Sequence, residues 1–524
     1  MALGTGQMPS NRLRRRDFLR IAGGAAAGVL IPTSCRTAKT SPPLPAKPPN
    51  IVFILADDMG YGDLACQNPE SKIPTPNLDR LAREGMRFTD AHSPAAVCTP
   101  TRYAILTGRY CWRTHLKSGV LWAWDPPLIE PDRLTLPAML KRHGYDTACI
   151  GKWHLGWDWP TTDGEKPDKQ TGQNVDFHRP VLNGPTARGF DYYFGTAVPN
   201  FPPYCFIEND RTVGIPAEQK PKTMFGHPGP MLPGWDLADI LPGLADKAVG
   251  YINAEAMKSP VVATGSPQRP FFLYFPLTAP HTPIAPAPRF RGKSQAGAYG
   301  DFVHQVDWTV GMVMAALERN GLTQNTLVMF GSDNGSPARD GANMSGPINS
   351  VRKYGHNPSG RLRGIKADVW DGGHRTPFIV RWPGRIEPGS VCDETICLVD
   401  LMATCAAIVG EKLAPDAAED SYNVLPALLG EKRAAPIRET TVHHSGGGMF
   451  AVRQGPWKLI LGRGSGGWTK GDRGEDLPPG QLYNMAENPS ETENLYTMRP
   501  DMVERLTAIL EKYKREGRSA PVSR

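Results

Sequence analysis

The stretch "NIVFILADD", Asn50 to Asp58, joins a continuous apolar run to two consecutive acidic residues. An unbroken apolar run of this length is typical of a strand buried on both faces of a parallel sheet. Ligands of open α/β sheets bind beyond the carboxyl ends of the strands. The sequence therefore predicts a buried strand that delivers Asp57 and Asp58 to a binding edge, although the acidic pair alone is also typical of a solvated turn.

Strand and helix patterns alternate along the chain that follows this first strand. Helical spacing occurs in 75–85, 134–144 and 299–321, and apolar strand patterns occur in 145–151, 269–276 and 325–335. Alternation of this kind predicts an α/β fold with a large mixed, mostly parallel sheet sandwiched by helices. Residues 158–234 are rich in Pro, Gly and Asn and are expected to form long loops over the sheet.

The pattern changes near Gly410, which predicts a smaller C-terminal α+β domain. Residues 441–462 resemble antiparallel strands joined by a glycine turn, and 499–517 have the pattern of a terminal helix. We therefore divide the folded chain into a catalytic domain, 50–410, and a C-terminal subdomain, 411–524.

The N-terminal 35 residues have the features of an export signal. An arginine pair, Arg15-Arg16, precedes an apolar run from Ile21 to Ile31 that is too short to span a bilayer. This order resembles a twin-arginine signal, whose export machinery carries folded proteins, and Cys35 is a candidate lipidation site. A disordered basic tail is the alternative. A Pro/Lys linker, 36–49, follows, and the expected location is the periplasm or the cell surface.

Charge excludes one class of function. The formal net charge is +7, but residues 1–35 hold five arginines and a single acid, so the remainder has 54 basic and 51 acidic residues. A net of +3 over the folded chain gives no basic surface for nucleic acid. Nine cysteines without a C-x-x-C pair do not form a complete disulfide framework.

Polar residues follow three of the predicted strands. Asp57 and Asp58 follow the first, the segment after 269–276 carries His281, and Asp333-Asn334 follow the strand in 325–335. Together they offer three carboxylates and one amide at one edge of the sheet. An oxygen-only set of this kind suits a hard cation, Ca²⁺ or Mg²⁺, rather than zinc.

Cys98 lies at the expected start of a helix that contains Pro100 in its first turn. Free N–H groups and the helix dipole attract anions at this position. Arg102 is four residues further along and shares a face with Cys98, and its side chain leans toward the N-terminus. The segment therefore places a reactive group, a dipole and a guanidinium around one anion.

The chain resembles the type I sulfatases of the alkaline phosphatase-like superfamily. The family signature C-x-P-S-R is matched by residues 98–102, with Thr101 in place of the commoner serine, and Leu-Thr-Gly-Arg follows at 106–109. Further matches occur in the expected order: "GKWHLG" at 151–156, "APHTP" at 279–283, "SDNG" at 332–335 and "GIKADVWDGGHRTP" at 364–377.

The resemblance implies that a maturation enzyme oxidises Cys98 to formylglycine, an aldehyde. One hydroxyl of its hydrate attacks sulfur and releases the alcohol; the other then loses its proton, the C–O bond breaks and sulfate leaves. The resemblance also implies a Ca²⁺ ion held by Asp57, Asp58, Asp333, Asn334 and the modified Cys98. Arg102 would stabilise the hydrate, and the sulfate would be surrounded by Lys152, His154, His281 and Lys366.

The expected reaction is the hydrolysis of a sulfated carbohydrate or an aryl sulfate. His154 or His281 is the candidate general acid or base, and His281 is the preferred candidate for protonating the leaving oxygen. A phosphatase or phosphodiesterase of the same superfamily is one alternative, and an inactive protein that binds sulfated glycans is another. Six of the 12 tryptophans fall in Pro/Gly-rich segments near the expected site, where exposed indoles would stack on a sugar or aryl ring. These are Trp112, Trp122, Trp124, Trp153, Trp157 and Trp159. His374, with Asp371 and Arg375, is expected to be structural.

Overall fold

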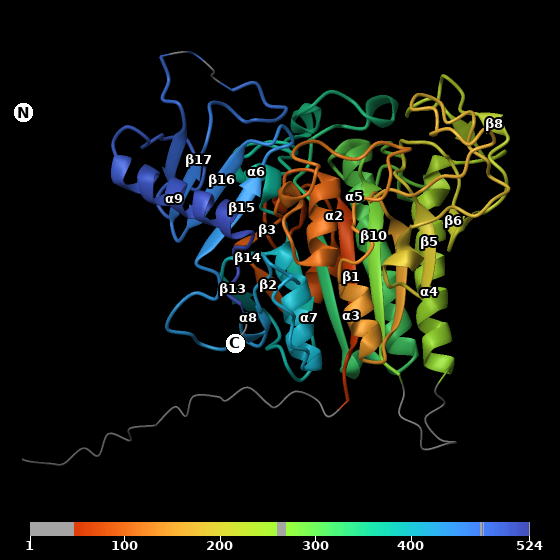
Figure 1. Ribbon diagram of the computed structural model, residues 1–524, viewed down its shortest axis with the longest axis horizontal. Helices are drawn as coiled ribbons and strands as arrows, with labels where there is room; N and C mark the ends of the chain where they lie inside the picture. The colour runs from red at the N-terminus through yellow and green to blue at the C-terminus, as the bar shows by residue number, and fades with distance from the viewer. Residues whose placement is uncertain (1–46, 259–268, 472–473, 475, 523–524) are drawn as a thin grey trace, which may run out of the picture. The chain divides into compact units, whose positions relative to one another are not determined.

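The computed structural model describes residues 47–258, 269–471, 474 and 476–522. Its centre is a ten-stranded sheet with the order β13-β2-β12-β11-β1-β10-β4-β5-β6-β7 (Figure 1). The strands are β1 (Asn50–Asp57), β2 (Met86–Phe88), β4 (Asp146–Lys152), β5 (Tyr192–Thr196), β6 (Ile207–Glu208), β7 (Arg211–Thr212), β10 (Phe271–Pro280), β11 (Thr326–Ser332), β12 (Phe378–Arg381) and β13 (Ser390–Cys392). The five central strands, β11 to β5, are parallel, and the edges are mixed, so the predicted fold class is confirmed.

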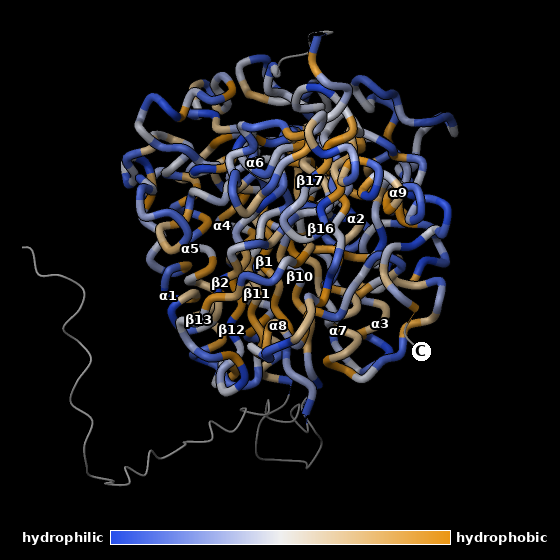
Figure 2. Tube along the Cα trace, turned by 90° about the vertical axis from the view of Figure 1, so that its left-hand side faces the viewer, coloured by the Kyte–Doolittle hydropathy of each residue, from blue (hydrophilic) through white to orange (hydrophobic). Residues whose placement is uncertain are grey.

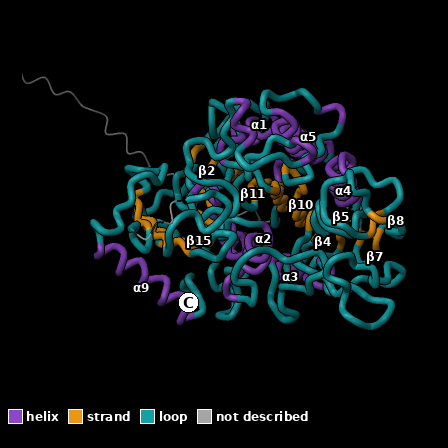
Figure 3. The backbone as a smooth tube through the Cα atoms, turned by 90° about the horizontal axis from the view of Figure 1, so that it is seen from above, coloured by secondary structure: helices purple, strands orange, loops and turns teal. Residues whose placement is uncertain are grey.

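Strand β1 occupies the middle of the sheet because both of its faces are apolar. Ile51, Phe53 and Leu55 join one hydrophobic cluster, and the alternate residues of the strand join another on the opposite face. The first cluster includes helices α2 (Cys98–Thr107), α3 (Leu136–Arg142) and α7 (Leu401–Val409), and the second includes α1 (Pro76–Glu84), α4 (Ile240–Met257) and α5 (Gly297–Arg319). Figure 3 shows α1, α4 and α5 on one side of the strands and α2 and α3 on the other, and Figure 2 shows apolar residues gathered along the central strands.

The C-terminal part contains a four-stranded antiparallel sheet in the order β15-β16-β17-β18. Its strands are β15 (Thr440–His444), β16 (Phe450–Gln454), β17 (Trp457–Ile460) and β18 (Gln481–Asn484), covered by α9 (Pro500–Glu516). Met502, Leu506 and Leu510 of α9 pack on the sheet, and Gly517 follows the helix with a positive φ. The remaining α-helices are α6 (Asp371–His374) and α8 (Leu425–Leu428), and the remaining strands form the pairs β3 (Ala91–His92) with β14 (Ile396–Cys397) and β8 (Glu218–Gln219) with β9 (Pro230–Met231). A domain boundary at residue 410 stays a prediction.

The expectation of loops alone over 158–234 is wrong in one respect. Strand β5 lies in this range and extends the main sheet beside β4, with β6 and β7 at its edge. These strands are two to five residues long, too short to give a periodic signal among the surrounding prolines and glycines. The export signal, 1–35, and the linker up to residue 46 lie outside the described residues. Within the described residues, none of the helices has the length and apolar character needed to cross a membrane.

Three buried histidines pack together beside the C-terminal sheet. His92 of β3, His374 of α6 and His443 of β15 form a cluster in which the rings of His374 and His443 stack with centroids 4.0 Å apart. Nδ1 of His92 lies 3.1 Å from Nδ1 of His374. Charged groups around them are Asp90, Asp371, Arg375, Arg453, Lys458 and Glu491. This packing agrees with the structural role expected for His374.

The histidine cluster predicts a loss of stability in mild acid. Burial lowers the pKa of all three histidines, and the neighbouring histidine and Lys458 add to the effect at His374. An unfolded histidine has a pKa of about 6.5, so the stabilisation is complete above that pH and is lost as the pH falls below it. We expect each histidine to remove about 1.4 kcal/mol of unfolding free energy per pH unit. The substitution His443→Asn should reduce this slope, measured by urea unfolding between pH 6.5 and 5. The matched control His178→Asn, at an exposed position, should keep the wild-type slope; equal slopes in all three proteins would contradict the prediction.

Candidate active site

Cys98 is the first residue of helix α2, the position that the sequence predicts. Val97, which precedes it, provides no side-chain cap, so the first amides of the helix remain available to an anion. The Cys98 side chain is 2% exposed, and its Sγ lies 3.6 Å from both Asp57 Oδ1 and Lys366 Nζ. Burial raises the pKa of this thiol to about 12, so the unmodified side chain is a neutral thiol at neutral pH.

The carboxyl ends of β1 and β11 bring the acidic residues together. These strands are parallel neighbours, and Ala56 is paired with Ser332, so the residues that follow each strand meet at one edge. The backbone N–H of Asp58 donates to Asp333 Oδ1 at 3.2 Å, and Asn334 Nδ2 donates to Asp58 Oδ1 at 2.7 Å. Asp57, Asp58 and Asp333 are all buried, as the predicted binding edge requires.

The donor set fits a hard cation. Potential ligand atoms of Asp57, Asp58, Cys98 and His281 lie within 4.8 Å of one another. The Oδ1 atom of Asn334 is buried beside Asp58 and accepts no hydrogen bond from the described residues. A buried amide oxygen without a donor, next to carboxylates, is in a suitable position to bind a cation. His281 belongs to this group only because its ring nitrogen lies close to the other atoms, and the sequence did not predict it as a metal ligand. Asp333 and Asn334 are not in the group and stay predicted ligands.

Three cations neutralise the three carboxylates. Lys152 Nζ lies 2.8 Å from Asp57 Oδ2, and Lys366 Nζ lies 2.8 Å from Asp58 Oδ2. Arg102 donates to Asp333 Oδ2 through both Nε and Nη2, at 3.0 and 2.7 Å, and through Nη1 to the Lys152 carbonyl at 3.0 Å. Burial is the largest single influence on Lys366 and opposes its charge, but the contributions of Asp58, Cys98 and Asp57 together exceed it and raise the lysine pKa. A bound divalent cation would therefore make the centre positive and attract an anionic ester.

The two predicted histidines each use one ring nitrogen for a backbone contact. Nε2 of His154 lies 2.9 Å from the Leu121 carbonyl, and Nδ1 of His281 contacts the Thr282 carbonyl at 2.5 Å. Carbonyls only accept, so these nitrogens carry protons, and Nδ1 of His154 and Nε2 of His281 are the free nitrogens. Burial lowers the pKa of His281 to about 4, helped by Lys366, and lowers that of His154 well below its ordinary value.

Strained backbone occurs at several positions around the site. Four non-glycine residues there have positive φ angles: Asp58 at 70°, His154 at 54°, Ala338 at 55° and Ala367 at 72°. A positive φ costs a non-glycine residue of order 1 kcal/mol or more, and such residues cluster at functional sites. The surrounding fold therefore holds these side chains in positions that a relaxed chain would not adopt.

The site opens into a pocket of about 690 Å³. Of the predicted site residues, the pocket wall contains Asp58, Cys98, His154, His281 and Lys366. The other predicted residues, Asp57, Arg102, Lys152, Asp333 and Asn334, are buried behind this wall. The chemistry predicted from separate motifs is thus gathered in one place, with one group of residues facing the pocket and another supporting it.

Of the six tryptophans expected to present exposed indoles near the site, one does so. Trp122 is 58% exposed and lines the pocket, stacked on Phe201 with ring centroids 5.2 Å apart. The other five are 2% to 7% exposed and pack in the core, which corrects the expectation of exposed indoles at those positions. Sequence reasoning missed two pocket residues, Arg339 and Trp468. Trp468 could have been noticed in the sequence because it lies in the glycine-rich segment 462–471. Arg339 has no such sequence feature beyond its position six residues after Asp333.

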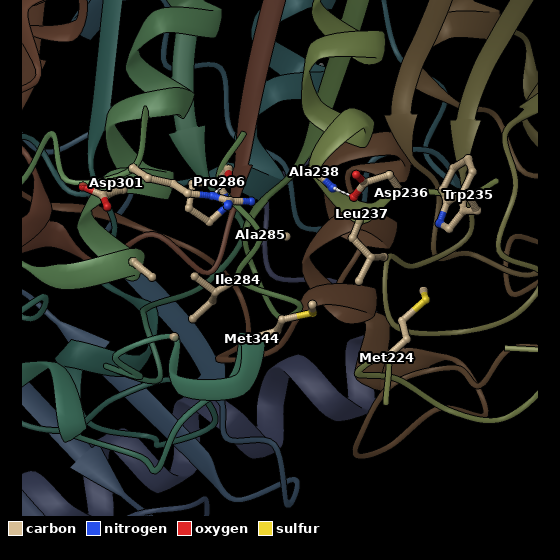
Figure 4. Close-up of a pocket in the computed structure, with 13 residues that line it drawn as sticks. Met224, Trp235, Asp236, Leu237, Ala238, Ile284, Ala285, Pro286, Asp301 and Met344 are labelled. Atoms are coloured by element: carbon tan, nitrogen blue, oxygen red, sulfur yellow. Dashed lines mark hydrogen bonds between the residues drawn. The ribbon is translucent and has the colours of Figure 1, made fainter. Parts of the chain in front are cut away.

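A second cavity, of about 510 Å³, lies beside the loops of the first (Figure 4). Ile284 and Ala285 follow the His281 segment, and Met224 and Met344 line the cavity from other loops. Its carboxylates serve the backbone: Asp301 accepts from the N–H groups of Gly292 and Ser294, and Asp236 accepts from that of Ala238. None of the predicted site residues lines this cavity, whereas five of them line the first pocket.

Comparisons with known proteins define the class of this chain. The model of the sulfatase family matches residues 49–411. A Bacteroides thetaiotaomicron N-acetylgalactosamine-6-O-sulfatase is 34% identical over 498 residues, which cover 89% of this chain and 93% of the relative. The steryl-sulfatase of Mus musculus is 34% identical, covering 83% and 73%. A solved structure described for glycosaminoglycan metabolism by Bacteroides thetaiotaomicron is 32% identical with a TM-score of 0.77, covering 90% of this chain and all of the other.

The fold and the matched segment define a sulfuric ester hydrolase of the alkaline phosphatase-like superfamily. The chain belongs to the sulfatase family. The resemblance found in the separate sequence motifs is therefore confirmed at the level of the family.

Proposed function

We propose that this protein hydrolyses sulfate esters of carbohydrates, using formylglycine made from Cys98 and a calcium ion. The observation that carries the proposal is the position of Cys98 at an uncapped helix N-terminus, between the Asp57 carboxylate and the Lys366 ammonium. The carbohydrate substrate is supported by relatives named as N-acetylgalactosamine-6-sulfatases. An aryl sulfate is the alternative substrate, and a phosphate ester is the alternative chemistry.

Asp57, Asp58, Asp333 and Asn334, together with residue 98, would hold Ca²⁺, with Mg²⁺ as the second candidate. The cation would neutralise charge beside the ester, and a hydrated formylglycine would supply an oxygen nucleophile and a route for sulfate to leave. A maturation enzyme must provide the aldehyde. The export machinery and a periplasmic or cell-surface location, with Cys35 as the candidate lipid anchor, belong to the same proposal.

The protein's own residues then bind the ester and move its protons. Lys366 faces the pocket and binds sulfate oxygens, while Lys152 adds its positive charge from behind Asp57. Arg102 fixes Asp333 and stabilises the oxygens carried by residue 98. Nε2 of His281 is the ring nitrogen left free by the Nδ1 contact with Thr282, and we assign it to the leaving oxygen. The neutral ring carries its proton on Nδ1, so Nε2 must take up a proton before it can pass one to that oxygen. Nδ1 of His154 is buried without a hydrogen-bond partner among the described residues, and His154 lines the same pocket as residue 98, so we assign this nitrogen to accept a proton from residue 98.

The test combines mass spectrometry with a comparison of substrates. The chain is expressed with a formylglycine-generating enzyme, and the tryptic peptide 88–102, which contains residue 98, is weighed. We expect an aldehyde in place of the thiol, and release of sulfate from a 6-O-sulfated sugar at least about 100-fold faster than phosphate from its phosphate analogue. Preference for the phosphate would favour the phosphatase alternative. A converted peptide with binding but no hydrolysis would favour an inactive binding protein, and turnover without the aldehyde would contradict the mechanism.

A further inference from the structure

Among the described residues that line the pocket, Arg339 carries a positive charge that the proposed mechanism does not use. Arg339 lines the pocket, and its Nη1 donates to Ser345 Oγ at 3.1 Å and to the Gly346 carbonyl. Both contacts are made by Nη1, so they hold the guanidinium in place through this one nitrogen. Within the described residues, no carboxylate forms an ion pair with it.

This lack of a partner distinguishes Arg339 from the other cations of the site. Arg102, Lys152 and Lys366 each pair with a carboxylate at 2.8 Å or less. The Asp58 carboxylate influences Arg339 only by electrostatic attraction, without a direct contact. Burial lowers the pKa of the arginine, but the guanidinium remains charged at neutral pH. A half-buried guanidinium without a counter-ion, on a pocket wall, is a binding site for an anion.

Trp468 shows where this charge lies relative to the sulfate-binding lysine. The Arg339 guanidinium is 6.0 Å from the centre of the Trp468 ring, and Lys366 Nζ is 5.7 Å from the same centre. Trp468 is 43% exposed, so its indole offers an apolar surface to the pocket. Both cations therefore lie close to the same partly exposed aromatic surface.

The Trp468 loop is held in place by the Lys366 segment. A Cβ atom at Gly467 would lie 2.1 Å from the Ala367 carbonyl oxygen, so only glycine permits this close approach. The N–H of Thr469 donates to Asp368 Oδ1 at 3.0 Å. The C-terminal part of the chain thus contributes a fixed surface to the pocket, built directly onto the strand-connecting segment that carries Lys366.

We propose that Arg339 binds a second anionic group of the substrate, a carboxylate or another sulfate, while Lys366 binds the sulfate that is cleaved. The inference rests on the proposed function and deepens it, because it selects polyanionic sulfated glycans over singly charged sulfate esters. Trp468 packs against the sugar between the two anions.

Substrate comparison with charge variants tests this assignment. The three substrates are 6-O-sulfated N-acetylgalactosamine, the same sugar with a second sulfate, and its disaccharide with a uronic acid. In the wild-type holoenzyme, kcat/KM should be at least about tenfold higher for one dianionic substrate than for the singly charged sugar. Arg339→Gln should reduce this ratio at least tenfold, and Arg339→Lys should restore part of it. The favoured substrate identifies the second anion as sulfate or carboxylate.

The matched control is Arg352→Gln, an exposed arginine outside the pocket, which should leave the ratio unchanged. A wild-type preference for the singly charged sugar, or an unchanged ratio in Arg339→Gln, would overturn the role of Arg339 and leave the proposed function standing. Failure of the wild-type enzyme on all three sugars would instead count against the proposed function.

Discussion

Cys98→Ala is expected to lower kcat/KM on any sulfate ester by at least about 1,000-fold, because the substitution removes the atom from which the nucleophile is made. The loss should appear in kcat. The fold should persist, since alanine fits the same helix start and the thiol makes only two long contacts, both at 3.6 Å. Circular dichroism and steady-state kinetics on the same preparation measure the two effects.

The control is Cys111→Ala, which removes another buried thiol. Cys111 is also 2% exposed but does not line the pocket. We expect this variant to retain the wild-type kcat per folded molecule. Comparable activity in Cys98→Ala and in the wild-type protein would rule out residue 98 as the source of the nucleophile.

Arg102→Ala is expected to lower both the free energy of unfolding and the catalytic activity. The side chain is fully buried and forms a two-nitrogen contact with Asp333. Removing one partner of a buried ion pair leaves an uncompensated charge, which costs about 3–5 kcal/mol of unfolding free energy. Activity of the folded fraction should fall by about 1,000-fold, in the range found when a preorganised hydrogen-bond donor is lost.

Arg438→Ala separates these two effects. Arg438 is equally buried and pairs with Asp400, but it lies in the C-terminal part, away from the pocket. Denaturant unfolding should show a similar loss of stability in both variants. Kinetics at a temperature where both are folded should show a large loss of kcat only for Arg102→Ala; equal losses would mean that Arg102 is purely structural.

The parts of the site carried by local patterns could be predicted from the sequence. The apolar run ending in Asp57 and the strand ending in Asp333 form neighbouring parallel strands, so their acidic ends had to meet. Cys98 begins its helix because proline is tolerated in the first turn and the following residues propagate the helix. In these cases secondary structure alone decides which side chains share an edge.

The parts that depend on tertiary contact could not be predicted in this way. Trp468 reaches the pocket only because Gly467 packs on Ala367, a contact between residues 100 positions apart in the chain. The burial of Trp124 and Trp159 against each other is likewise decided by packing and not by their Pro/Gly-rich surroundings.

The depth at which Cys98 lies sets an order of events during biosynthesis. In the folded protein an enzyme would meet a thiol that is 2% exposed and enclosed by helix α2 and two strand ends. Oxidation is therefore expected on the nascent or unfolded chain, before the sheet closes over the residue. Twin-arginine translocation accepts folded cargo, so a chain with such a signal would be oxidised first, folded second and translocated last.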